Sequence, residues 1–164
     1  MKLIEAFGKL NGSTHNLVIA GKKGKVFADS VGRTLAPHAS AGVGNPTYAQ
    51  FLGYVPDSAL PALYSGASAV LTTSLYEGSG LTALEAMACG APVIASNTTS
   101  FPEVTGDAAL LVNPNHVEEI ANAIKKIIED PHFANTLRER GLQRSKQFTW
   151  DESARKTQSL LESL

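Results

Sequence analysis

The most informative segment of the chain runs Glu77-Gly78-Ser79-Gly80-Leu81-Thr82-Ala83-Leu84-Glu85. A short apolar run at residues 69–72 precedes it and predicts a strand. From Leu81, small and apolar residues continue to Cys89 and predict a helix, which Gly90 ends. A strand, a glycine-containing loop and a helix in this order are typical of a doubly wound parallel sheet, so the segment indicates an α/β fold.

The same segment carries candidate chemistry. Gly78 and Gly80 flank Ser79 and let backbone N–H groups come close to a ligand, while the helix N-terminus adds unpaired donors and a partial positive charge. This combination suits a phosphate, and Glu85, about one and a half turns into the helix, could accept hydrogen bonds from a sugar diol. Alternatively, Glu77 only favours the helix dipole and the glycines only make a turn. From these residues alone a structural loop is favoured, because such loops are common in doubly wound sheets.

Strand and helix patterns alternate along the rest of the chain, which predicts a Rossmann-like, mainly parallel sheet flanked by helices. Two helix starts resemble capping boxes, Asn115 with Glu118 and Thr149 with Glu152. Trp150 is expected to pack the last helix onto the body. Residues 30–47 have little periodicity, and from Pro37 we expect a mobile loop. Expected strands are 17–20, 51–52, 69–72, 92–95 and 108–112, and expected helices are 3–10, 57–67, 81–89, a short turn at 102–105, 115–128, 132–146 and 151–164.

Bulk properties narrow the function class. The chain has 164 residues, which predicts one domain, and its net charge of −1 gives no bulk attraction toward nucleic acid. A single cysteine, Cys89, excludes an intrachain disulfide, and the four histidines are scattered without metal-ligand spacing, so no metal site is predicted. The first residues lack the apolar run of a signal peptide, and no run reaches membrane-spanning length. A cytoplasmic protein is therefore expected.

A longer stretch of the sequence resembles a known protein family. Residues 75–95, LYEGSGLTALEAMACGAPVIA, resemble the signature of family 4 retaining glycosyltransferases of the GT-B fold. Other family landmarks follow in the family's order, with LIEAF at 3–7, VIAG at 18–21, FLGYV at 51–55 and FTW at 148–150. The resemblance covers nearly the whole chain. It matches only the C-terminal, nucleotide-sugar-binding half of that two-domain fold.

The resemblance implies roles for particular residues. Glu85 would hold the ribose hydroxyls of a nucleotide, and Glu77, the catalytic candidate, would lie near the donor sugar and its departing phosphate. The amides of Gly80 and Leu81 would contact the sugar or the pyrophosphate. The donor would be a nucleotide-diphosphate hexose, with no metal and no other cofactor. The implied nucleotide-sugar site consists of Tyr54 and Val55, which would border the base, and of Gly78, Ser79, Gly80, Leu81, Thr82 and Glu85.

The sequence also departs from the family pattern. Ser79 stands where the family often has Phe, and Thr82 where it often has Pro, so the donor sugar stays open. The family's domain opens with a strand that ends in Gly-Arg, whereas here Met1 and Lys2 already begin the first helix. We therefore expect residues 1–164 to be one donor-binding domain, without its first strand and without the N-terminal acceptor domain. The alternatives are a stand-alone, non-catalytic nucleotide- or sugar-binding module, or a flavodoxin-like domain, for which no acidic cluster or flavin loop is seen.

The missing strand has a consequence for the sheet. In the usual strand order, 3-2-1-4-5-6, the first strand lies between the strands at residues 17–20 and 69–72. Without it, each of these strands keeps an unpaired row of backbone groups, which is costly when buried. The two strands could pair directly at about 4.8 Å, another chain could supply a strand by self-association, or the gap could stay open. We expect direct pairing or self-association.

Overall fold

The computed structural model describes residues 2–10, 14–21 and 49–163. The loop expected from Pro37 lies outside these residues. The strands are β1 (Leu17–Ala20), β2 (Ala49–Gly53), β3 (Val70–Thr72), β4 (Val93–Ser96) and β5 (Ala109–Val112). The helices are α1 (Lys2–Gly8), a 3-10 turn at Asp57–Ala59, α3 (Leu60–Gly66), α4 (Leu81–Ala88), α5 (Phe101–Thr105), α6 (Val117–Glu129), α7 (Pro131–Ser145) and α8 (Trp150–Glu162).

All strand pairs of the described chain are parallel, as the sequence predicts for an α/β fold. β1 pairs with β2, and a second sheet has the order β3-β4-β5, with Val93 opposite Val70 on one side and Ala109 on the other. Parallel neighbours require crossover connections, which α4 and α5 provide in the second sheet. β4 is the middle strand of that sheet and is buried along its whole length, as expected for a strand covered on both faces.

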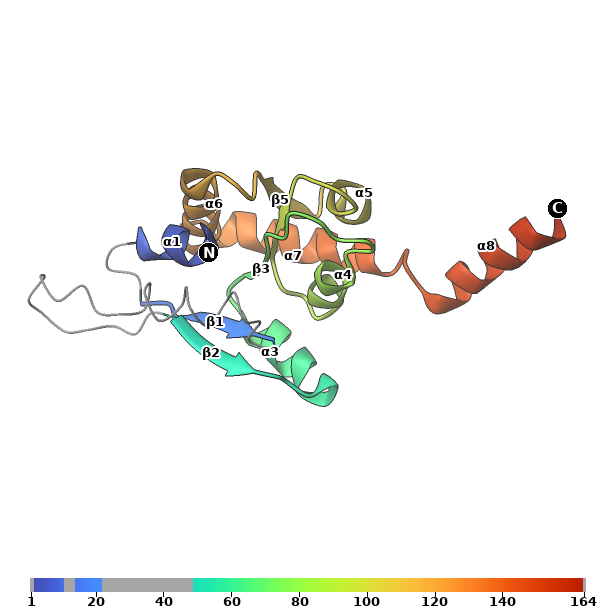
Figure 1. Cartoon of the computed structure of the whole chain (residues 1–164), viewed down its shortest axis with the longest axis horizontal. Coiled ribbons are helices and arrows are strands. Elements are labelled where there is room, and N and C mark those ends of the chain that lie inside the picture. Colours follow the sequence, from blue (N-terminus) through green and yellow to red (C-terminus); the bar gives the residue numbers. More distant parts are fainter. Residues whose placement is uncertain (1, 11–13, 22–48, 164) are drawn as a thin grey trace, which may run out of the picture.

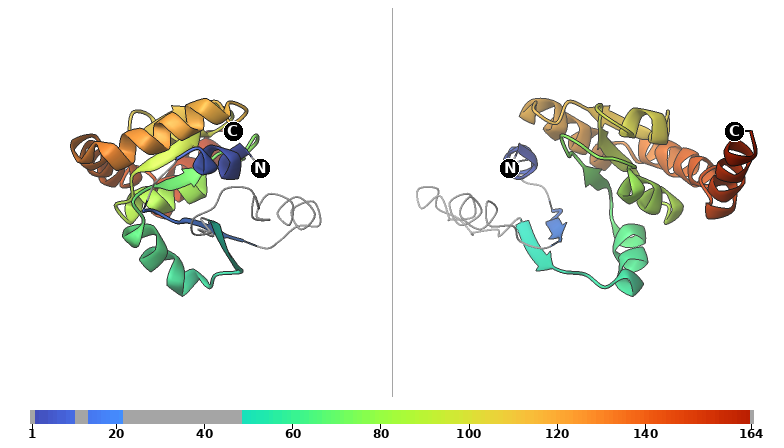
Figure 2. Two further views of the ribbon diagram at one scale, coloured as in Figure 1. Left: turned by 90° about the vertical axis from the view of Figure 1, so that its left-hand side faces the viewer. Right: turned by 45° about the vertical axis from the view of Figure 1, so that its right-hand side comes forward.

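The helices cover the second sheet and join the two sheets into one core (Figure 2). α1 packs against α6, and α4 packs against α7. Side chains from α1, both sheets and α6, among them Ile4, Leu17, Ile94 and Ile124, belong to one buried apolar cluster. Lys9 and Glu118 add an ion pair between the end of α1 and the start of α6. The core therefore holds α1 beside the strands, although α1 is only seven residues long.

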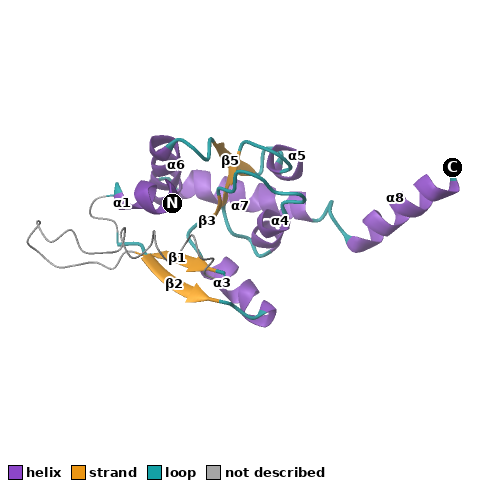
Figure 3. Ribbon diagram, in the orientation of Figure 1, coloured by secondary structure: helices purple, strands orange, loops and turns teal. Residues whose placement is uncertain are grey.

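The predicted direct pairing of residues 17–20 with residues 69–72 is wrong. Among the described residues, β1 has β2 as its hydrogen-bonded neighbour and β3 has β4, and no backbone ladder joins the two sheets. Figure 3 shows the two sheets as separate groups of strands, and Leu17 and Ala49 of one sheet belong to the same apolar cluster as Ile94 of the other. Whether another chain supplies a strand to these edges stays a prediction.

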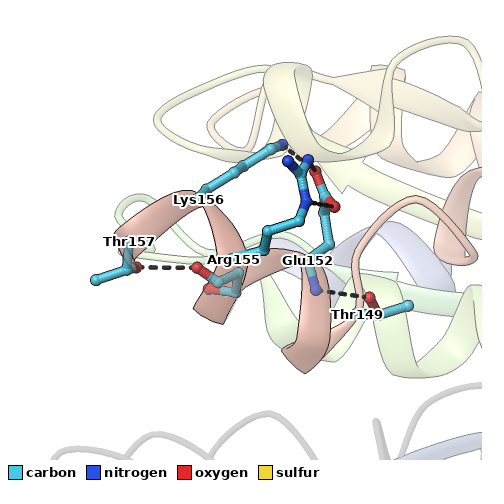
Figure 4. A network of polar contacts seen from close by, with 6 residues as sticks. Thr149, Glu152, Arg155, Lys156 and Thr157 are labelled. Carbon is cyan, nitrogen blue, oxygen red and sulfur yellow. Dashed lines mark hydrogen bonds and ion pairs between the residues drawn. The ribbon is translucent and has the colours of Figure 1, made fainter. Parts of the chain in front are cut away.

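The last helix also differs from expectation. Trp150 does not pack α8 onto the body: its side chain is 82% exposed, and α8 has no buried residue. Figures 1 and 2 show α8 extending away from the rest of the chain. Its start is held locally, since the Thr149 hydroxyl accepts a hydrogen bond from the Glu152 amide at 3.1 Å, as the capping signature predicts. In Figure 4 the Glu152 carboxylate also meets Arg155 and Lys156, and its hydrogen bond with Arg155 lowers the pKa of Glu152.

The capping box expected at the start of α6 does not form. The residue before α6 is His116, which makes no side-chain cap, so the predicted role of Asn115 is wrong. The Asn115 amide instead donates to the side chain of Asn113, whose own amide donates to Glu119. The connection from β5 to α6 is thus closed by a turn that satisfies its own polar groups. None of the helices in the described ranges is both long enough and apolar enough to span a bilayer.

Candidate functional site

The N-terminus of α4 has the geometry that the glycines predict. Gly80 is the residue before the helix and has φ 66° and ψ 24°, a left-handed conformation that glycine adopts without a Cβ penalty. Its carbonyl accepts from the amides of Ala83 and Leu84 at 3.0 and 3.3 Å. Within the described ranges, the amides of Leu81 and Thr82 have no acceptor. Two donors at a positively polarised helix end are thus available to an anion.

Gly80 rests on a buried aromatic ring. A Cβ at this position would lie 3.5 Å from Cδ1 of Phe101, the fully buried first residue of α5. Ser79 and Gly78, immediately before it, are exposed. The loop therefore packs on the core at Gly80 and is exposed at Gly78 and Ser79, which the family resemblance places in the nucleotide-sugar site.

The second loop of the site, residues 97–100, holds Glu77. The Glu77 amide donates to the Thr99 hydroxyl at 3.2 Å, and the Glu77 carbonyl accepts from the Ser100 hydroxyl at 3.1 Å. Ser74 donates from its hydroxyl to Oε1 of Glu77 at 2.9 Å. The backbone and the carboxylate of this half-buried residue are therefore both held by hydrogen bonds. The carboxylate bond uses Oε1, and Oε2 of Glu77 has no hydrogen bond in the described structure.

The two loops meet because β3 and β4 are parallel neighbours, so both strands end at the same edge. The Ser96 hydroxyl donates to the Ser74 carbonyl at 2.6 Å and reinforces this junction. Thr99 has φ 56°, a left-handed conformation that costs a residue with a β-branched side chain about 1–2 kcal/mol. Strain of this kind concentrates at functional sites, and the surrounding hydrogen bonds must hold it. Sequence reasoning missed Thr99 and Ser100, although a polar cluster directly after a buried strand was a signal for them.

Glu85 is exposed on α4 and has one fixed oxygen. Its Oε2 accepts a hydrogen bond from the Tyr64 hydroxyl at 3.0 Å. Tyr64 lies on α3, which packs against α4. Burial, followed by the hydrogen bond to Glu85, raises the pKa of Tyr64 to about 12, so the phenol is a neutral donor at physiological pH. In the sequence, Tyr64 shares one face of the expected helix 57–67 with Leu60 and Leu63, and this spacing does not predict a contact with Glu85.

The structure thus brings most predicted site residues together in one unit, residues 77–85, which comprise the end of the loop after β3 and the first part of α4. Tyr54 and Val55 lie elsewhere, directly after Gly53 at the end of β2 in the other sheet. Tyr54 is exposed and Val55 is half-buried, and no hydrogen bond of the described residues joins either of them to residues 77–85. From Val55 the chain leads into α3, which is the link to α4. Their predicted role at the base stays a prediction.

The part of the chain that the structure describes shows no group of three or more histidine, cysteine, aspartate or glutamate side chains that could hold a metal ion. The two carboxylates of the site have different partners, since Glu77 accepts from the Ser74 hydroxyl and Glu85 from the Tyr64 phenol. Metal independence nevertheless stays a prediction.

Solved structures show which class of protein has this fold. The fold is that of the α/β domains of GT-B glycosyltransferases, with parallel sheets flanked by helices. Sucrose-phosphate synthase from Thermosynechococcus elongatus superposes with a TM-score of 0.81 at 28% identity, covering 99% of this chain and 41% of that one. Anabaena HepE, solved in complex with UDP, gives a TM-score of 0.86 at 24% identity, covering 99% of this chain and 44% of HepE, and shows a shared fold.

The chain belongs to the family of group 1 glycosyl transferases, whose sequence model matches residues 1–144. O-antigen chain mannosyltransferase B of Escherichia coli is 46% identical over 108 residues, which are 66% of this chain and 28% of that enzyme. This chain therefore spans less than a third of the length of that relative.

Proposed function

We propose that residues 1–164 form the donor-binding domain of a retaining, family 4 glycosyltransferase. This enzyme moves a hexose from a nucleotide-diphosphate sugar to an acceptor glycan, lipid or small molecule. Membership of the group 1 glycosyl transferases supports the reaction class. The observation that carries the proposal is local: α4 presents two unpaired amides at its start and the Glu85 carboxylate on its exposed side. The amides would bind a phosphate of a nucleotide, and the carboxylate would bind its ribose diol.

The charge that develops on the leaving diphosphate explains the proposed roles of these residues. As the bond between sugar and phosphate breaks, negative charge grows on the leaving diphosphate, and preorganised donors at a helix N-terminus stabilise it. The family resemblance implies the amides of Gly80 and Leu81 as such donors, and the Leu81 amide is one of the two unpaired amides at the start of α4. Glu77, held by Ser74 and Thr99, would lie near the donor sugar. Neither a metal nor another cofactor has a part in this proposal, and the protein acts in the cytoplasm.

Calorimetric titration with UDP, GDP, ADP and their hexose derivatives tests the proposal. UDP is included because HepE, a protein of the same fold, was solved with it. Glu85→Gln keeps the size of the side chain and removes charge-assisted hydrogen bonds, each worth about 1.5–3 kcal/mol. Affinity should fall at least about tenfold. Glu139→Gln on the exposed side of α7 is the matched control. An unchanged dissociation constant in Glu85→Gln would remove Glu85 from the site.

The 164-residue chain alone should bind the donor but transfer no sugar, because transfer requires donor and acceptor to be held together. An acceptor-binding domain is the partner that the proposal requires. Product analysis with labelled donor tests this, and sustained turnover by the purified chain would contradict the assignment as a donor-binding domain. The alternative, a stand-alone binding module, is favoured if the natural reading frame contains no second α/β domain. Self-association through the edges of β1 and β3 is also proposed, and sedimentation velocity at several concentrations would detect it.

A further inference from the structure

Among the described side chains that lie outside the predicted site and contact it, Tyr64 is the one that reaches Glu85. The Tyr64 hydroxyl lies 3.0 Å from Oε2 of Glu85, and within the described ranges this is the one hydrogen bond of the Glu85 side chain. The contact joins two helices, α3 and α4, across 21 positions of sequence. The ring of Tyr64 is half-buried against the apolar cluster of α4, β4 and α5. Its hydroxyl is thereby fixed by packing and aimed at an otherwise exposed carboxylate.

We propose that Tyr64 is a positioning residue, which orients the Glu85 carboxylate for the two ribose hydroxyls of a nucleotide and so sets the preference for ribose. This inference rests on the proposed function, since it requires that Glu85 binds the ribose.

The geometry supports this role through the oxygens of the carboxylate. An ionised carboxylate only accepts hydrogen bonds and has about four lone-pair sites on its two oxygens. Tyr64 occupies one site on Oε2 of Glu85. Oε1 and the remaining site of Oε2 stay available for two neighbouring hydroxyls. A carboxylate fixed on one side presents both acceptors in one orientation, which matches a cis-diol better than a freely rotating side chain does.

The energetics also support it. A glutamate on a helix surface has several rotatable bonds, and fixing such a side chain on binding costs conformational entropy. Tyr64 restricts these bonds before the ligand arrives, so part of that cost does not fall on binding. The phenol remains protonated far above neutral pH, because burial and the bond to Glu85 raise the pKa of Tyr64 to about 12. It therefore donates to Glu85 at every pH at which a nucleotide would be bound.

The variant Tyr64→Phe isolates the hydroxyl, because it keeps the ring and its packing. We compare wild type, Tyr64→Phe, Glu85→Gln and the double variant of the full 164-residue chain. Each is titrated with the tightest-binding nucleoside diphosphate among UDP, GDP and ADP, and with its 2′,3′-dideoxy counterpart, which lacks the diol. Tyr76→Phe is the matched control, since it removes the hydroxyl of a tyrosine that is 81% exposed and has no hydrogen-bond partner in the described structure.

We expect Tyr64→Phe to weaken binding of the ribonucleotide about three- to tenfold and to leave the dideoxynucleotide unchanged within about twofold. In the double variant, Tyr64→Phe should add no further loss to that of Glu85→Gln, because Tyr64 acts through Glu85. Equal weakening for both nucleotides would show a structural role and overturn the inference, as would additive losses in the double variant.

The outcomes separate the two proposals. If wild type binds a nucleotide and Glu85→Gln loses it, while Tyr64→Phe keeps the full ribose preference, the inference about Tyr64 fails and the proposed function stands. If wild type binds no nucleotide, or if Glu85→Gln binds as well as wild type, the assignment of Glu85 fails and the inference fails with it.

Discussion

Gly141 lies inside α7, one turn before its end, where this helix meets α4, and replacing it with alanine tests the packing behind the site. A Cβ at position 141 would lie 3.1 Å from Cγ of Met87, 3.3 Å from its Cβ and 3.5 Å from its Cα. Met87 is fully buried in α4 and has little room to turn away. The first two separations are shorter than ordinary van der Waals contact, so α4 and α7 must move apart or Met87 must leave its rotamer.

Two opposing effects set the size of the change. Alanine in place of glycine inside a helix stabilises by about 0.5–1 kcal/mol. Overpacking a core contact costs about 1–3 kcal/mol. Because Cβ of Met87, at 3.3 Å, does not move when the side chain changes rotamer, a new rotamer of Met87 cannot absorb the whole contact, and the packing cost dominates. We expect Gly141→Ala to lower the free energy of unfolding by about 1–2 kcal/mol, which for a chain of this size lowers Tm by roughly 2–8 °C.

Urea titration followed by circular dichroism at 222 nm measures this change, with a thermal scan beside it. Gly66→Ala is the matched control, because Gly66 is the last residue of α3 and a Cβ there would meet nothing within 4 Å. The control should be neutral or more stable by up to about 1 kcal/mol. If Gly141→Ala is as stable as wild type or gains stability like the control, the argument from close packing of α4 and α7 is refuted.

Two further predictions concern stability. Arg144→Met removes the donors to the carbonyls of Val104 and Glu103, at 2.9 and 2.6 Å. In urea titration this variant should lower the free energy of unfolding by about 1–3 kcal/mol. Arg155→Met, on exposed α8, is the control and should leave the urea midpoint unchanged. The raised pKa of Tyr64 means that the folded chain keeps a proton that the unfolded chain has lost, so this stabilisation is fully present below pH 10 and is lost between pH 10 and about 12. In Tyr64→Phe this share of the alkaline loss should be absent, and equal slopes in wild type and variant would contradict the shift.

The sequence predicts well what depends on neighbouring residues. The apolar run at 92–95 nearly coincides with β4, because a strand buried on both faces has no polar alternation to obscure it. The loop around Gly80 was predictable because its function in the fold is local: a left-handed residue must precede α4, and glycine adopts that conformation at little cost. Glu77 and Glu85 are found together in one unit for the same reason, since a single strand, loop and helix carry both.

Contacts between distant segments could not be predicted in the same way. Periodicity places Tyr64 on an apolar face, but it does not say that the hydroxyl reaches Glu85 on another helix. The two capping signatures show the same limit, because Thr149 caps its helix whereas the turn at Asn113 replaces the cap expected from Asn115. Trp150 failed for a related reason: an aromatic residue predicts burial, yet the described structure provides no surface that covers α8.

The two carboxylates of the candidate site are positioned by separate neighbours, which has a consequence for the proposed function. The Glu77 carboxylate accepts from the Ser74 hydroxyl, and the Glu77 backbone is held by hydroxyls of the loop after β4, where Thr99 has a strained backbone conformation. Glu85 depends on the phenol of Tyr64 in α3. No hydrogen bond of the described residues joins the two arrangements. Changes at Thr99 should therefore act on the sugar and phosphate end of a donor, and changes at Tyr64 on its ribose end, so the two ends of one ligand can be weakened independently.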